Sequence, residues 1–156
     1  MELELNERSR KRTRSQTLAI PIPVWESADY PRVDGGRRMV RAHKIQGPEW
    51  VRAFCRWSLR IEFHLMDEPG TVSLFVNLGT NRDRPRVGGR RSNYYRFWTM
   101  ANGTPPRKGE AMHYDIFIGK CFWALVENSV TDNAGRQKPE HDVYSRIVEL
   151  EELISQ

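Results

Sequence analysis

The sequence predicts a mostly β fold, a small barrel of five strands with one short helix between the third and fourth strands. Apolar and polar residues alternate along residues 57–65, which is the two-residue period of a strand with one buried face. The alternation resumes along residues 71–78, after a turn over residues 67–70. Residues 93–101 instead carry their apolar side chains at helical spacing. These segments predict a two-stranded hairpin, followed by a helix that packs at one end of the barrel.

Composition indicates a single domain that folds without a cofactor. The chain has 156 residues, of which 38% are hydrophobic, and it carries a formal net charge of +5. A chain of this length buries enough surface to fold without metals or disulfides, and its two cysteines are too few for a disulfide framework or a closed zinc site. No apolar run approaches the roughly 18 residues of a membrane span. We therefore expect a soluble cytoplasmic protein with no cofactor, no metal and no membrane contact.

Changes in composition along the chain predict four parts. Residues 1–17 hold five basic side chains and little that is apolar, so we expect a disordered basic arm that is dispensable for folding. Residues 18–32 are expected to be extended, because their prolines disfavour a helix. The OB-like barrel domain is predicted over residues 33–150, and residues 151–156 form an acidic C-terminal end.

The two alternating runs also predict how the hairpin pairs. If Met66 lies opposite Thr71, apolar residues of one run meet apolar residues of the other, beginning with Leu65 and Val72. The outer face of the hairpin is then polar apart from one aromatic residue. Its predicted pairs are His64 with Ser73, Glu62 with Phe75, and Arg60 with Asn77.

Turn and cap residues predict the neighbours of the hairpin. A first strand is expected over residues 37–45, and a loop rich in glycine and arginine over residues 79–91. Ser92 is the predicted N-cap of the helix, and Asn102-Gly103 supplies its left-handed stop.

The second half of the barrel is predicted from two further runs. A long strand interrupted at Gly119 is expected over residues 113–127, followed by a turn at residues 132–135. The last strand is expected over residues 143–148, and a short helix over residues 148–155 is an equal alternative to continued extended structure. Three strands, a helix and two strands is the order of an OB-fold, a small Greek-key barrel, although another connectivity of five strands is also possible.

The segments that begin at Phe54, Asn77, Ser92, Gly119 and Tyr144 carry a resemblance to a known group of proteins. They read Phe-Cys-Arg-Trp, Asn-Leu-Gly, Ser-Asn-Tyr-Tyr-Arg, Gly-Lys-Cys-Phe and Tyr-Ser-Arg-Ile. This layout resembles the OB-fold single-stranded DNA-binding and replication-associated proteins of phages and mobile elements, over residues 37–150. The resemblance implies a fold and supplies no catalytic signature or binding motif that transfers residue by residue.

Positive charge gathers in the middle of the chain. Residues 82–108 hold eight basic residues and one acid, and residues 37–60 hold seven basic residues and one acid. Binding a single strand requires cations for the phosphates and flat side chains on which bases stack. The predicted nucleic-acid-binding residues are Arg60, Phe75, Asn77, Arg82, Arg84, Arg86, Arg90, Arg91 and Tyr95.

Among these, Phe75 is the most informative, because its predicted neighbours on the outer face are polar. An equally good interpretation is that a helix or the N-terminal segment covers it. The aromatic residues assigned instead to the core face of the helix are Tyr94, Phe97 and Trp98.

No constellation of residues indicates an enzyme. Residues 86–91 hold two glycines that could approach a phosphate, but they lack the ending of a Walker loop. His64 and Glu62 are expected to form an exposed polar face rather than a metal site, because spacing places no third ligand beside them. The sequence therefore predicts a non-enzymatic module that binds single-stranded nucleic acid, with DNA as the expected strand, in replication or recombination of a phage or mobile element.

The alternative prediction is a protein-interaction adaptor. In that case the same barrel face, or the acidic C-terminal segment, binds a replication or defence protein.

Overall fold

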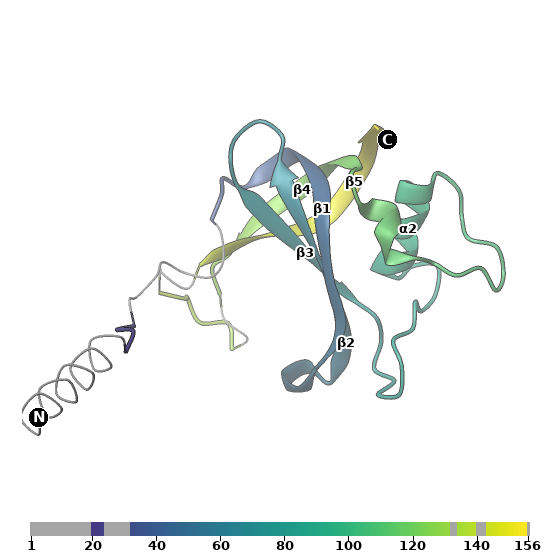
Figure 1. The fold of residues 1–156 in the computed structure, drawn as a ribbon, viewed down its shortest axis with the longest axis horizontal. Coiled ribbons are helices and arrows are strands. Elements are labelled where there is room, and N and C mark those ends of the chain that lie inside the picture. Colours follow the sequence, from purple (N-terminus) through teal and green to yellow (C-terminus); the bar gives the residue numbers. More distant parts are fainter. Residues whose placement is uncertain (1–19, 24–31, 132–133, 140–142, 156) are drawn as a thin grey trace, which may run out of the picture.

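Five strands close into a barrel in the computed structural model, which describes residues 20–23, 32–131, 134–139 and 143–155. They are hydrogen-bonded in the closed order β1-β2-β3-β5-β4, and all pairs are antiparallel except β3 with β5. Helix α2 (Asn93–Asn102) follows β3 and lies beside the barrel (Figure 1). The strands are β1 (Gly36–Val51), β2 (Arg56–Leu65), β3 (Thr71–Asn77), β4 (Cys121–Ser129) and β5 (Tyr144–Ser155). The predicted fold class, a mostly β barrel with one short helix between the third and fourth strands, is confirmed.

The hairpin of β2 and β3 forms, but its predicted register is wrong by two residues. Phe63, rather than Leu65, lies opposite Val72. The amide of Leu65 instead donates to the carbonyl oxygen of Gly70 at 3.0 Å, so the turn comprises residues 66–69. Gly70 can join the ladder with φ +142° because it has no Cβ. Side chains alternate with period two, so a shift of two residues leaves the predicted inward face buried. The observed outer pairs are Arg60 with Phe75, Glu62 with Ser73, and His64 with Thr71.

Arg38 on β1 bridges to this turn. Its guanidinium donates to Asp67 Oδ1 and to Glu68 Oε1, both at 2.9 Å. The hydrogen bond from Arg38 lowers the pKa of the Asp67 carboxyl. Because both acids are exposed, the bridge holds the turn in place rather than contributing much to stability.

Strand β1 extends to Val51, beyond the predicted end at residue 45. Val40 and Ala42 face the core, as alternation requires. A bulge after Ala42 then changes which face each side chain takes, so that Ile45 packs against the core opposite Ile61. The predicted strand passes through this bulge and ends at residue 45, just before a second irregularity between Gln46 and Glu49.

Helix α2 forms where it was predicted. The Oγ of Ser92 accepts a hydrogen bond from the Tyr95 amide at 3.4 Å, and Gly103 ends the helix with φ +85°. The helix lies against β3, β5 and the segment before β4. Its buried side chains are Tyr94, Phe97, Trp98 and Ala101, which is the core face expected from the sequence.

Residues 113–127 do not form the single interrupted strand that was predicted. A 3₁₀ helix, η2 (Tyr114–Phe117), occupies the first part, and β4 begins at Cys121. The ring of Phe117 is fully buried, with its centroid 6.1 Å from that of Tyr94 and 6.5 Å from that of Phe122. Packing of this ring between α2 and β4 favours the turn over an extended chain.

Strand β5 continues to Ser155, so the helical alternative for residues 148–155 is wrong. It pairs with β4 from Tyr144 opposite Ser129 to Ser155 opposite Cys121. The long ladder satisfies backbone groups that a short terminal helix would leave to water. Residues 151–155, expected to form an acidic end, therefore lie within the last strand.

Several predictions fall on parts of the chain outside the described residues. These are the basic arm over residues 1–17, most of residues 18–32, and residues 132–133 of the predicted turn. Within the parts that the structure describes, no helix has both the length and the apolar character needed to cross a membrane.

Candidate nucleic-acid interface

Arg60 and Phe75 lie opposite each other on the outer face of the β2–β3 hairpin. Nε of Arg60 donates to Ser73 Oγ at 2.9 Å, and the guanidinium carbon lies 5.8 Å from the centroid of the Phe75 ring. Phe75 is 42% exposed, so no described element covers it. A cation and an open aromatic ring therefore stand side by side, and the two-residue change of register is what brings them opposite each other.

These two side chains line a polar cleft of about 420 Å³. Its remaining lining residues come from β1 and the start of β2, and they are Gln46, Gly47, Glu49 and Ser58. Gly47 has φ +94°, and a Cβ there would lie 3.0 Å from the Glu49 amide nitrogen and 3.1 Å from the Ser58 carbonyl oxygen. A larger residue at position 47 would force this wall of the cleft to move.

The loop that follows β3 is tied to the start of β2. The backbone amide of Trp57 donates to Gly79 O at 2.9 Å, and its indole Nε1 donates to Asn81 O at 2.7 Å. The amide of Arg86 returns to Leu78 O at 2.7 Å. The loop consequently runs beside the end of the β1–β2 hairpin that projects from the barrel (Figure 1). Trp57 was expected only as a strand residue, and no sequence signal marked its role in holding this loop.

The loop presents five exposed guanidinium groups, those of Arg82, Arg84, Arg86, Arg90 and Arg91. None of them forms an ion pair with a carboxylate in the described part of the chain. By contrast, Arg37, Arg38 and Arg96 are each paired with Asp or Glu side chains. Cations without an internal partner are available to phosphates, which is the property that nucleic-acid binding requires.

Of the nine predicted residues, Arg60 and Phe75 line the cleft and the other seven do not: four are arginines of the loop, and the remaining three are Asn77, Arg86 and Tyr95. The side-chain oxygen of Asn77 accepts from the Gly79 amide at 2.8 Å and so closes its own turn. Arg86 lines a separate hollow of about 130 Å³ together with Tyr94. Tyr95 is half-buried on α2 and lines neither hollow.

The tip of the β1–β2 hairpin is a candidate that the sequence interpretation missed. The chain turns there through a 3₁₀ helix, η1 (Arg52–Phe54). Phe54 is 49% exposed, and the guanidinium carbon of Arg56 lies 5.0 Å from its ring centroid. This repeats the pairing of a cation with an open ring seen at Arg60 and Phe75. The aromatic and basic residues were visible in the sequence, but their position at a tip was not, because β1 was expected to end at residue 45.

A pair of stacked imidazoles lies on the same two strands. The ring centroids of His43 and His64 are 3.7 Å apart, and His43 Nε2 is 3.6 Å from Glu62 Oε1. Nδ1 of His43 is buried without a hydrogen-bond partner in the described structure. Burial lowers the pKa of His43, and His64 and Lys44 act in the same direction against the opposing effect of Glu62.

We expect stability to fall between about pH 7.5 and about pH 5.5, in part because of His43. Its pKa is lower in the folded chain than the ordinary 6.5, so the unfolded chain takes up a proton first. The stability that the neutral ring supplies is present above pH 6.5 and is lost as the pH falls. Urea unfolding of wild type and His43→Gln at both pH values measures the loss of unfolding free energy in each protein. An equal loss in the two proteins would contradict the assignment.

Among the described residues, no group of three or more His, Cys, Asp or Glu side chains is placed to hold a metal ion.

No family model matches the chain, and no curated protein matches it. The candidate interface therefore rests on its geometry. It combines a cleft that holds a cation and an exposed ring with an arginine loop that is tied to the start of β2 and forms no ion pair with a described carboxylate.

Proposed function

We propose that this protein is a non-enzymatic module that binds single-stranded nucleic acid, with DNA as the expected strand. The observation that carries the proposal is the cleft in which Arg60 lies opposite the exposed ring of Phe75. A base stacks on an aromatic face whatever its identity, and each stacked base contributes roughly 1–3 kcal/mol. The guanidinium of Arg60, beside the ring, contacts the phosphate of the same nucleotide.

The barrel supports the proposal through its connectivity. The closed order β1-β2-β3-β5-β4, with a helix between β3 and β4, is the arrangement we expect of an OB-fold. In that fold the faces of the second and third strands, with the loop between the first two, bind oligonucleotides. Arg60 and Phe75 lie on the equivalent strands, and Phe54 lies at the equivalent loop.

The arginine loop supplies the part of the affinity that does not depend on base identity. Exposed guanidinium groups without internal ion pairs displace counterions from phosphates. We propose that the protein acts in replication or recombination of a phage or mobile element, as the sequence resemblance implies, with the cytoplasm as its expected location.

Salt dependence tests the proposal directly. If four or five phosphates are neutralised, the slope of log affinity against log salt is expected to be about −3, at roughly −0.7 for each phosphate. Replacing both Arg90 and Arg91 by alanine is expected to make the slope shallower by about one to one and a half, equally for all base compositions. Fluorescence anisotropy with labelled oligonucleotides, over a salt series, measures both quantities.

The matched control is the double replacement of Arg107 and Lys108 by alanine, which removes the same charge from two exposed neighbours beyond α2. Its slope is expected to stay near that of wild type. Absence of salt-sensitive binding to any single strand at micromolar protein would contradict the proposal and favour the adaptor function. In the adaptor function the acidic segment would be less available to a partner, since Glu151 and Glu152 are both paired with Arg37.

A further inference from the structure

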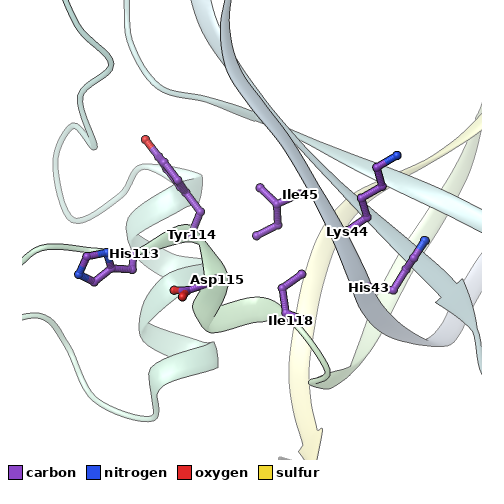
Figure 2. A pocket seen from close by; sticks show the side chains of 7 residues that line it. All are labelled: His43, Lys44, Ile45, His113, Tyr114, Asp115 and Ile118. Carbon is purple, nitrogen blue, oxygen red and sulfur yellow. The ribbon is translucent and has the colours of Figure 1, made fainter.

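A third, mostly apolar hollow lies between β1 and η2. It has a volume of about 570 Å³, and Tyr114 and Asp115 of η2 line it together with Ile118, the residue after η2. Figure 2 shows Ile45 pointing from β1 toward η2, while Lys44 and His43 project on the opposite side of the β1 ribbon. The volume is within the range of pockets that hold small ligands, which are typically apolar with a few polar groups.

The hollow opens where two strands separate. The last backbone hydrogen bonds between β1 and the chain entering β4 are Ala42 N to Lys120 O at 3.1 Å and Gly119 N to Ala42 O at 2.8 Å. Beyond them β1 is hydrogen-bonded to β2, while η2 packs between β1 and α2 without joining the sheet. The hollow thus arises where β1 and the chain that enters β4 separate. Ile45, which packs against the core, forms its base.

The residues around the hollow have the chemistry that a nucleobase needs. The ring of Tyr114 offers a flat face on which a base stacks, and Ile118, which is 43% exposed, adds aliphatic contact beside it. Lys44 is exposed and forms no ion pair with a described carboxylate, so it is available to a phosphate. Asp115 is an exposed carboxylate, which accepts hydrogen bonds from exocyclic amino groups of bases and repels bare phosphates.

The hollow is also close to the cleft of Arg60. Gln46 lines that cleft, and Lys44, two residues earlier on β1, lines the hollow. Two residues of a strand span roughly 7 Å and point to the same face. Lys44 and Gln46 share the face of β1 that carries the cleft, and Ile45 faces the hollow from the other side, so a strand that leaves the cleft along β1 reaches the hollow by passing the edge of β1 at Lys44.

We propose that this hollow holds one base of the bound strand, an amino-bearing base whose exocyclic group donates to Asp115 while Lys44 contacts its phosphate. The inference rests on the proposed function and adds to it a base preference, for cytosine over thymine in the simplest comparison. A peptide segment is the other occupant that an apolar hollow could take, and in that case Ile118→Asp would bind oligonucleotides as well as its control variant does.

Affinities for oligo(dC) and oligo(dT) of equal length test the inference. Wild type is expected to favour oligo(dC) by about fivefold or more, and Asp115→Asn is expected to remove most of that preference. Ile118→Asp places a charge at the mouth of the hollow, and is expected to weaken binding of both strands about fivefold or more. Val130→Asp is the matched control, since Val130 is equally exposed and lies outside the hollow.

Two results separate failure of the inference from failure of the proposed function. If wild type binds both strands in a salt-sensitive way, but Ile118→Asp equals Val130→Asp and Asp115→Asn keeps the wild-type preference, the hollow holds no base and the inference is overturned. If wild type binds neither strand, the proposed function itself fails and the inference falls with it.

Discussion

Replacing Phe117 by alanine is expected to lower the free energy of unfolding by about 3–5 kcal/mol, the range for removing a buried aromatic side chain. The ring is fully buried and packs against Tyr94 of α2 and Phe122 of β4. Its loss would leave a cavity where η2, the helix and the barrel meet. Urea unfolding followed by tryptophan fluorescence measures the change.

A loss of this size is a large fraction of the roughly 5–15 kcal/mol of stability of a small domain, so Phe117→Leu is measured beside Phe117→Ala. Phe117→Leu keeps most of the volume and is expected to lose about 1.5 kcal/mol or less. Phe75→Ala is the matched control, since it removes the same side chain from an exposed site. A loss below about 1 kcal/mol in Phe117→Ala would show that η2 is not packed into the core.

Phe75→Ala is expected to weaken binding of single-stranded oligonucleotides about 5- to 150-fold, which corresponds to a stacking contribution of roughly 1–3 kcal/mol. The slope of log affinity against log salt is expected to remain unchanged, because stacking releases few counterions. This separates Phe75 from the loop arginines, whose loss changes the slope. Fluorescence anisotropy at several salt concentrations measures both effects.

Phe75→Tyr is the control for this prediction, because it keeps an aromatic face at the same place and is expected to retain most of the affinity. If Phe75→Ala binds as well as wild type while the double replacement of Arg90 and Arg91 still weakens binding, the strand follows the loop and does not cross the cleft of Arg60.

The inner face of the hairpin could be predicted from the sequence, but the register could not. Alternation specifies which residues point inward. Shifting the pairing of the two strands by an even number of residues leaves the same side chains on the inner face. Choosing between shifts requires the turn, where Gly70 joins the ladder and Arg38 from β1 holds Asp67. The consequence for the candidate site is direct, because Arg60 meets Phe75 in the observed register and would meet Asn77 in the predicted one.

Only part of the candidate site could be predicted, because the rest depends on interactions between strands rather than on local sequence. The exposed arginine loop follows from composition and from glycines that disfavour regular structure. Its attachment through the Trp57 indole, and the tip carrying Phe54 and Arg56, depend on where β1 bends and ends. A bulge leaves little mark in the sequence beyond a break in alternation.

The sequence alone determined the elements whose signal is local: the alternation of β2 and β3, and the helix with its Ser92 cap and Gly103 stop. Only the tertiary structure decided between strand and turn before β4, and between strand and helix in residues 148–155. In the first case the deciding interaction is the burial of Phe117 between distant elements, and in the second it is a ladder with β4. Both interactions join residues far apart in the chain, so no pattern of neighbouring residues records them.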